Sequence, residues 1–462
     1  MPWDGVPMNN PGPLTKTRAL LIGALLLSLA ALVSVALKPR PTVVQPGGLA
    51  VSKGSAVRVE ARSSHAAVHE NGTEFFTELT VTLDEHESTP VERVSLALVL
   101  DHSGSMSGQK MEDAKKAAHR LVDLMQDGDE LTLVSFGSDV NAGERTQLNA
   151  SSRPALHAAI DLVQASGSTF ISGGVTAGWA ALKSATGARR LVLVSDGQPT
   201  VGLTDEASLA QLIGQVHQDA ITVTALGVGS DYDGMLMQHL AERGGGMYGY
   251  LKDASTLEEV LGLEVTAARL AVARNVELQL DSNELQVIDS PGRHVEWRSG
   301  RAVLHLADLR PGLPTRVFVR VRSHRASAGD RPQFAASVTW RATGGAPQRS
   351  DVGLALTVVD DVAQVDASRD EAVYARGITA LGSLQLVAAA AAYERGDVAT
   401  ATGLFDSARA VFGMSADALA GQAEVDDTRR AYGSASTEER KSMGRKLESK
   451  KLTSFGRMNE GY

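Results

Sequence analysis

The 462-residue chain contains no cysteine. This absence excludes disulfide bonds, thiolate nucleophiles and zinc or iron–sulfur sites held by cysteine. Basic residues are also in deficit, since 45 Lys and Arg stand against 54 Asp and Glu and give a net charge of −9. An acidic chain is a poor match for non-specific phosphate binding, so we expect no nucleic-acid partner. With 43% hydrophobic residues, the chain is apolar enough to form about two to four globular domains.

One long hydrophobic run follows an N-terminal tail of residues 1–18. Residues 19–37 are uncharged, consist mostly of Leu, Ala and Val, and have two basic residues on each side. The run is long enough to span a bilayer and longer than the core of a usual signal peptide, which favours an uncleaved transmembrane anchor. Cleavage near Ser34-Val35-Ala36, giving a secreted protein, is the alternative. The balanced charges do not orient the segment, and we expect a single-pass protein whose soluble body is extracytoplasmic, in the periplasm or at the cell surface.

From residue 92 the chain alternates apolar strands with amphipathic helices. Strands this apolar are typical of a parallel sheet with helices on both faces. Residues 92–270 are therefore predicted to form a doubly wound, Rossmann-like α/β domain. Its predicted strands are 94–100, 130–136, 190–195, 221–227 and 247–251, and its predicted helices are 110–125, 153–165, 174–185, 206–218, 232–243 and 255–270.

Strand-like segments flank this domain on both sides. Residues 41–91 contain two predicted strands around a turn at Asn71-Gly72, and residues 271–360 alternate apolar and polar side chains between Gly and Pro turns. We expect these two regions to form one β-sandwich into which the α/β domain is inserted.

The end of the chain is predicted to be helical. Residues 361–432 are rich in alanine and contain a predicted helical hairpin, 368–393 and 398–412, followed by a weaker helix. Residues 433–462 carry many Lys and Arg and are predicted to be a solvated, partly disordered tail. A basic docking segment is the alternative for this tail.

Side chains that carry oxygen follow three strands of the predicted α/β domain. Asp101, Ser103 and Ser105 come after the first strand, Thr169 lies in a later loop before a helix, and Asp196 follows the strand at 190–195. The carboxyl ends of parallel strands meet at one edge of a sheet, so we expect these side chains to converge. Carboxylates and hydroxyls without nitrogen or sulfur suit a hard cation such as Mg²⁺. Helix capping by the two serines alone is the competing interpretation, but it leaves Thr169 and Asp196 unexplained.

The order and spacing of these residues resemble the metal-ion-dependent adhesion site of von Willebrand factor type A domains. The pattern is Asp101-x-Ser103-x-Ser105, then Thr169, then Ser195-Asp196-Gly197. The resemblance covers residues 94–270, and the wider order of segments is similar to bacterial membrane-anchored type A proteins labelled calcium-activated chloride channel homologues.

The resemblance implies roles for the five residues. Ser103 and Ser105 would bind the metal directly, Thr169 directly or through water, and Asp101 and Asp196 mostly through water. Mg²⁺ is the expected ion, with Mn²⁺ and Ca²⁺ as alternatives. A carboxylate from a partner protein would complete the shell, because a dication with few charged ligands stays electrophilic.

We therefore expect a membrane-anchored protein-binding module, an adhesion or scaffold protein that captures an acidic residue of its partner, and not an enzyme. One alternative is a structural scaffold in which the metal only stabilises the fold and the β and helical regions bind the partner. Another is a metal-assisted hydrolase, but no general base can be assigned: the side chain of His102 should point away from Asp101 and Ser103 if the loop is extended.

Overall fold

The computed structural model describes residues 48–52, 56–84, 93–196, 198–229, 233–251, 261–262, 264–266, 268–269, 273–281, 283–342 and 346–451. Contacts divide the chain into residues 1–41 and 42–462, and all described residues lie in the second unit. The anchor predicted at 19–37 lies outside the described residues, as does much of the helix predicted at 255–270. Both remain predictions.

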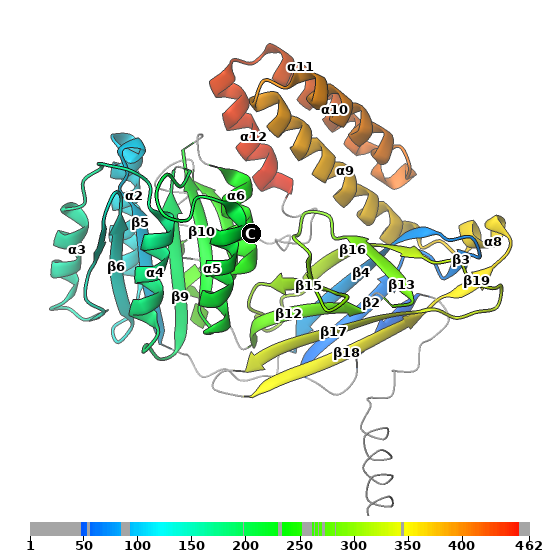
Figure 1. Cartoon of the computed structure of the whole chain (residues 1–462), viewed down its shortest axis with the longest axis horizontal. Coiled ribbons are helices and arrows are strands. Elements are labelled where there is room, and N and C mark those ends of the chain that lie inside the picture. The colour runs from blue at the N-terminus through cyan, green and yellow to red at the C-terminus, as the bar shows by residue number, and fades with distance from the viewer. Residues whose placement is uncertain are drawn as a thin grey trace, which may run out of the picture. The chain divides into compact units, whose positions relative to one another are not determined.

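The α/β domain is built on a sheet of mixed direction (Figure 1). Its parallel strands lie in the order β11-β10-β9-β5-β6. Two short pieces, β7 and β8, pair with β6 in the antiparallel sense, so the prediction of an all-parallel sheet was wrong at this edge. Both are short and largely exposed, so they lack the apolar pattern that marks the buried strands. The strands are β5 (Val94–Asp101), β6 (Glu130–Phe136), β7 (Val140–Ala142), β8 (Thr146–Gln147), β9 (Ala188–Ser195), β10 (Thr222–Val228) and β11 (Gly245–Leu251).

Helices cover both faces of this sheet, as predicted. The side chains of β5 alternate between two apolar cores: Leu96, Leu98 and Leu100 pack with α2 and α3, whereas Ala97 and Val99 pack with α4 and α5. Successive side chains of a strand point to opposite faces, so a strand buried on both sides reads as one continuous apolar run. The helices are α2 (Gln109–Leu124), α3 (Arg153–Asp161), α4 (Ile171–Leu182), α5 (Glu206–Gln218) and α6 (Gly234–Arg243).

A β-sandwich joins the segments on either side of the α/β domain. Strand β4, which precedes that domain, pairs antiparallel with β16, which follows it. This pairing confirms that the α/β domain is inserted into one sandwich. The first sheet has the order β1 (Leu49–Val51), β2 (Val57–Ser63), β4 (Glu74–Leu83), β16 (Thr315–Ser323) and β13 (Leu285–Asp289).

The second sheet packs on the first across a shared apolar core that includes Phe75, Phe334 and Trp340. A separate two-stranded parallel sheet, β3 (Ala67–His69) and β19 (Thr357–Val359), contributes Val68 and Val358 to the same core. The order of the second sheet is β14 (Glu296–Arg298), β15 (Arg301–Leu306), β12 (Ala273–Asp281), β17 (Gln333–Ala342) and β18 (Pro347–Ala355).

The C-terminal region is helical, and it extends further than predicted. Residues 437–451 form helix α12, whereas the sequence predicted a solvated tail there. Its Leu447 is buried in the core of the helical region, Lys451 pairs with Glu424, and Arg440 donates a hydrogen bond to the carbonyl of Tyr432. Contacts with earlier helices thus hold a segment whose composition is typical of a solvated tail. The helices are α8 (Val362–Ala367), α9 (Glu371–Glu394), α10 (Val398–Phe412), α11 (Ala420–Ser434) and α12 (Thr437–Lys451).

Within the described ranges, helix α9 is the helix whose length and composition would allow it to cross a membrane. Its most apolar stretch is 56% buried within the protein, where Ile378 and Leu386 contact α10 and α11 residues in one apolar core. This burial is typical of a core helix of a folded domain.

Candidate metal centre

Asp101 is the last residue of β5 and is fully buried. Its Oδ1 accepts a hydrogen bond from the backbone N–H of Ser103 (2.7 Å), and its Oδ2 accepts one from the hydroxyl of Ser195 (2.5 Å). Burial raises the pKa of Asp101, and these hydrogen bonds oppose that shift. Because the donors come from the loop after β5 and from the end of β9, the carboxylate fixes the loop against the neighbouring strand.

Three further oxygens form a connected chain across the sheet edge. Ser103 Oγ lies 3.0 Å from Ser105 Oγ, and the Ser105 hydroxyl donates a 2.7 Å hydrogen bond to Oδ1 of Asp196. Neighbouring ligands of an octahedral Mg²⁺ with metal–oxygen distances of ~2.1 Å are ~3.0 Å apart. The separations are those of direct hydrogen bonds, and they place the three oxygens close enough together to be neighbouring ligands of one small divalent cation.

Thr169 lies on a loop that is joined to the first loop through the backbone. The N–H of Gly104 donates to the carbonyl of Gly167 (3.0 Å), and the N–H of Thr169 donates to the hydroxyl of Thr200 (2.9 Å). Thr169 is buried, at 5% exposed. Within the described part of the chain, its hydroxyl makes no hydrogen bond to the other four predicted ligands. The structure thus links Ser103, Ser105 and Asp196 directly, and it connects Thr169 to them only through its loop.

Lys110 is a part of this site that the sequence analysis missed. Its Nζ lies 2.6 Å from Oδ2 of Asp196, whose side chain is completely buried. The lysine stem packs against Gly229, which has φ +75° and where an added Cβ would lie 2.8 Å from Lys110 Cε. The sequence feature that could have indicated it is the position of this lysine in the first turn of α2, the helix that follows the Asp-x-Ser-x-Ser loop. The Asp196 carboxylate is thus already paired with an internal cation.

The donor set consists mainly of hydroxyls. In the ranges that the structure describes, no group of three or more His, Asp or Glu residues is placed to hold a metal ion. The candidate centre instead offers three hydroxyls and two carboxylates, of which Asp196 is already paired with Lys110. Such a centre would leave a bound dication with much of its charge, so that it attracts an external anionic ligand.

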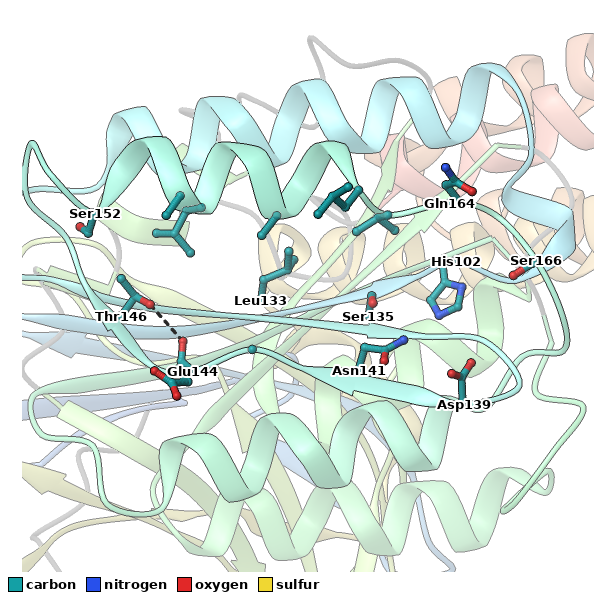
Figure 2. Close-up of a pocket in the computed structure, with 16 residues that line it drawn as sticks. His102, Leu133, Ser135, Asp139, Asn141, Glu144, Thr146, Ser152, Gln164 and Ser166 are labelled. Atoms are coloured by element: carbon teal, nitrogen blue, oxygen red, sulfur yellow. Dashed lines mark hydrogen bonds between the residues drawn. The ribbon is translucent and has the colours of Figure 1, made fainter.

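His102 points away from this edge, as the sequence predicted. It lines a cavity on the α3 side of the sheet, and none of the five predicted ligands lines that cavity (Figure 2). The imidazole is therefore not positioned as a general base for a water molecule at the metal centre.

Comparisons with known proteins identify the α/β domain. Residues 95–262 match the model of the von Willebrand factor type A domain. Uncharacterized protein YfbK of Escherichia coli is 27% identical over 213 residues, which are 44% of this chain and 36% of YfbK. Inter-alpha-trypsin inhibitor heavy chain H1 of Sus scrofa is 26% identical over 220 residues, which are 45% of this chain and 24% of that protein. The chain thus spans about a third or less of the length of these relatives.

Two solved structures share the fold over most of the chain. A von Willebrand factor type A protein from Catenulispora acidiphila superposes with a TM-score of 0.64 at 17% identity and covers 82% of this chain and 90% of its own. The ArnB paralog VWA2 from Sulfolobus acidocaldarius gives a TM-score of 0.58 at 16% identity and covers 88% of this chain and all of its own. Identities this low show a common fold and no more.

Proposed function

We propose that the α/β domain, whose residues 95–262 match the model of the von Willebrand factor type A domain, binds a divalent cation and, through it, a carboxylate of a partner protein. Asp101, Ser103, Ser105, Thr169 and Asp196 would hold the cation. The observation that carries the proposal is the chain of oxygens from Ser103 to Asp196, with separations of 3.0 and 2.7 Å. The donor set of hydroxyl and carboxylate oxygens, with no nitrogen or sulfur, supports Mg²⁺, with Mn²⁺ as a close substitute.

The residues of the site would have two roles: some would position the loop that binds the cation, and others would bind the cation without neutralising its charge. Asp101 is anchored by Ser103 N–H and the Ser195 hydroxyl, and so it positions the loop. Ser103 and Ser105 offer neutral oxygens, which leave the charge of the cation uncompensated. A bound cation would supply an electrophilic point for an incoming Asp or Glu side chain. The partner is thus expected to present an acidic residue on an accessible loop.

We propose that the rest of the chain presents this domain outside the cytoplasm. The apolar run at residues 19–37 would serve as the membrane anchor, and the sandwich and helices would support the type A domain. Secretion after cleavage is the alternative. Protease added to spheroplasts of the expressing cells should digest the body of the chain; protection of the body in intact spheroplasts would contradict the extracytoplasmic placement.

Titration calorimetry tests the metal site first. Mg²⁺ and Mn²⁺ are titrated into the full-length chain in lipid nanodiscs, with empty nanodiscs as the blank, beside the Asp101→Ala variant. We expect one bound ion in the wild type and none in the variant. A folded wild type that binds no Mg²⁺ or Mn²⁺ would contradict the proposal.

A peptide selection then tests the partner chemistry. A phage-displayed random peptide library is selected on the Mg²⁺-loaded protein and eluted with EDTA. We expect the eluted peptides to share an Asp or Glu whose replacement by Asn or Gln abolishes binding. Binders that keep their affinity in EDTA and on Asp101→Ala would show that the interaction lies elsewhere, on the sandwich or the helices.

A further inference from the structure

We propose that the α/β domain carries a second binding site, separate from the metal centre, for a small molecule with an apolar body and a protonated amine. The site is a cavity of about 600 Å³ between helix α3 and the edge of the sheet formed by β6, β7 and β8 (Figure 2). This volume lies within the range of ~300–1,000 Å³ that is usual for small-molecule sites.

One wall of the cavity is apolar. It is formed by α3 and the loop that follows it, together with one residue of β6. Leu162 on this wall is 79% exposed, so a ligand lying against it would remove apolar surface from water. The apolar wall consists of Leu133, Ala155, Leu156, Ala159, Leu162 and Val163.

Polar groups gather at one end of the cavity, around His102 (Figure 2). The His102 side chain is only 7% exposed, and neither ring nitrogen has a hydrogen-bond partner among the described residues. A buried polar group without a partner is costly, and nearly all such groups in folded proteins are satisfied. A neutral imidazole has one nitrogen that accepts a hydrogen bond, which an amine N–H would satisfy.

The protein fixes the position of this ring. The backbone N–H of His102 donates to Phe136 (2.7 Å), and its carbonyl accepts from Ser166 (2.6 Å). Gly137 lies against the ring, where an added Cβ would come within 2.7 Å of His102 Cε1 and 2.8 Å of the Ser166 carbonyl. The absence of a side chain at Gly137 therefore makes room for the imidazole at the end of the cavity.

The charge of the lining selects the ligand class. Asp139 lies at the His102 end and Glu144 at the opposite end, and no Lys or Arg is part of the lining (Figure 2). Neither carboxylate forms an ion pair with another described residue. A cationic ligand would gain attraction from both, whereas an anionic ligand would be repelled. An ammonium group would be held between the Asp139 carboxylate and the imidazole of His102.

Calorimetry with two matched probes tests the proposal. The probes are 4-phenylbutylamine and 4-phenylbutyrate, which share the apolar body and differ in the sign of the charged end. They are titrated into the full-length chain in nanodiscs, with EDTA present so that the metal centre takes no part. We expect the amine to bind with one-to-one stoichiometry and about tenfold more tightly than the carboxylate.

Variants tie the binding to this cavity. Ala155→Trp fills the cavity and should abolish amine binding, whereas Ala158→Trp on the same helix, outside the lining, should leave it unchanged.

Asp139→Asn should weaken binding about tenfold, with Asp161→Asn as the matched control. His102→Phe keeps a ring but removes both nitrogens, and it should also weaken binding about tenfold. Folded wild type that binds no amine, equal affinity for the two probes, or Ala155→Trp binding as well as wild type would each overturn the proposal.

Discussion

The α/β domain and the β-sandwich place their polar side chains differently. In the α/β domain, fully buried polar residues gather where the parallel strands end: Asp101, Ser103 and Asp196 are at most 1% exposed. In the sandwich, most large buried side chains are apolar, the buried Glu78 is paired with Arg376, and charged pairs such as Arg320 with Asp289 are partly exposed.

This difference follows from topology. Parallel strands begin at one edge of the sheet and end at the other, so the loops after them collect polar residues in one place. Antiparallel strands reverse at both ends, and the two sheets of a sandwich cover each other with apolar side chains. We therefore expect changes in the sandwich to affect stability and changes at the strand ends of the α/β domain to affect binding.

The largest expected effect is on the sandwich. Phe334 is completely buried in its core, and Phe334→Ala should lower the free energy of unfolding by about 3–5 kcal/mol because it leaves a cavity. Mg²⁺ affinity should not change while the protein is folded. Urea denaturation followed by the fluorescence of the buried Trp340, together with calorimetry, measures both. Trp297→Ala, at an exposed position of the same sandwich, is the control, and a parallel loss of Mg²⁺ affinity would show that the two regions are not independent.

Removing one hydroxyl at the edge of the α/β sheet should weaken Mg²⁺ binding and leave the stability of the fold nearly unchanged. Ser103→Ala should weaken Mg²⁺ binding about 100-fold, equivalent to ~2.7 kcal/mol, because it removes an oxygen from the proposed ligand set. The free energy of unfolding without metal should change by less than ~1 kcal/mol. Ser107→Ala, in the same segment but outside the set, serves as the matched control. Equal metal affinity in the two variants would remove Ser103 from the site.

Replacing Lys110 should have a smaller effect, and it should strengthen Mg²⁺ binding. Its ammonium occupies the Asp196 carboxylate at 2.6 Å, so a metal ion must compete with an internal cation. Lys110→Met should strengthen Mg²⁺ binding about tenfold, or ~1.4 kcal/mol. Lys116→Met, which removes a largely exposed lysine from the same helix, should have no measurable effect. Weaker binding by Lys110→Met would mean that the lysine positions Asp196 and does not compete for it.

The smallest expected effect, measured per pH unit, is a pH dependence that belongs to the sandwich region. Burial, with Arg369 nearby, lowers the pKa of His65 from 6.5 to about 4. The unfolded chain therefore binds this proton first as the pH falls, and stability should decline between about pH 6.5 and 4, by ~1 kcal/mol in the first unit. His65→Gln should reduce the slope without abolishing it, because burial also lowers the pKa of His305 to about 4. Denaturation curves at several pH values measure this slope, and a steeper decline in His65→Gln would contradict the assignment.

Patterns that depend on neighbouring residues in the chain were predictable. The strand β6 and the helix α5 begin and end at the predicted residues, because a two-sided buried strand and an amphipathic helix each have a distinct apolar period. Helix α12 and the strands β7 and β8 were not predicted. Helix α12 was missed because its sequence is highly charged, and it is held by contacts with residues earlier in the chain, among them those of buried Leu447. Strands β7 and β8 are too short to show any period.

The candidate site was predictable in part. Asp101, Ser103 and Ser105 are placed by one loop, so their spacing in the sequence is enough to propose them. Ser103, Ser105 and Asp196 are connected only because β5 and β9 are neighbours in the sheet. Lys110 could not be assigned to Asp196, since many lysines occur in first turns and only the packing against Gly229 directs this one.

By itself, the sequence determined the order of strands and helices, the oxygen donors at the strand ends and the direction of His102, because alternation along an extended chain sends neighbouring side chains to opposite sides. Only the tertiary structure decided which donors meet, which lysine joins them and where a cavity forms beside His102. Those features depend on contacts between residues distant in the chain, such as Lys110 with Asp196 and Gly137 with His102. No local pattern encodes such contacts, because they arise when separate elements pack together.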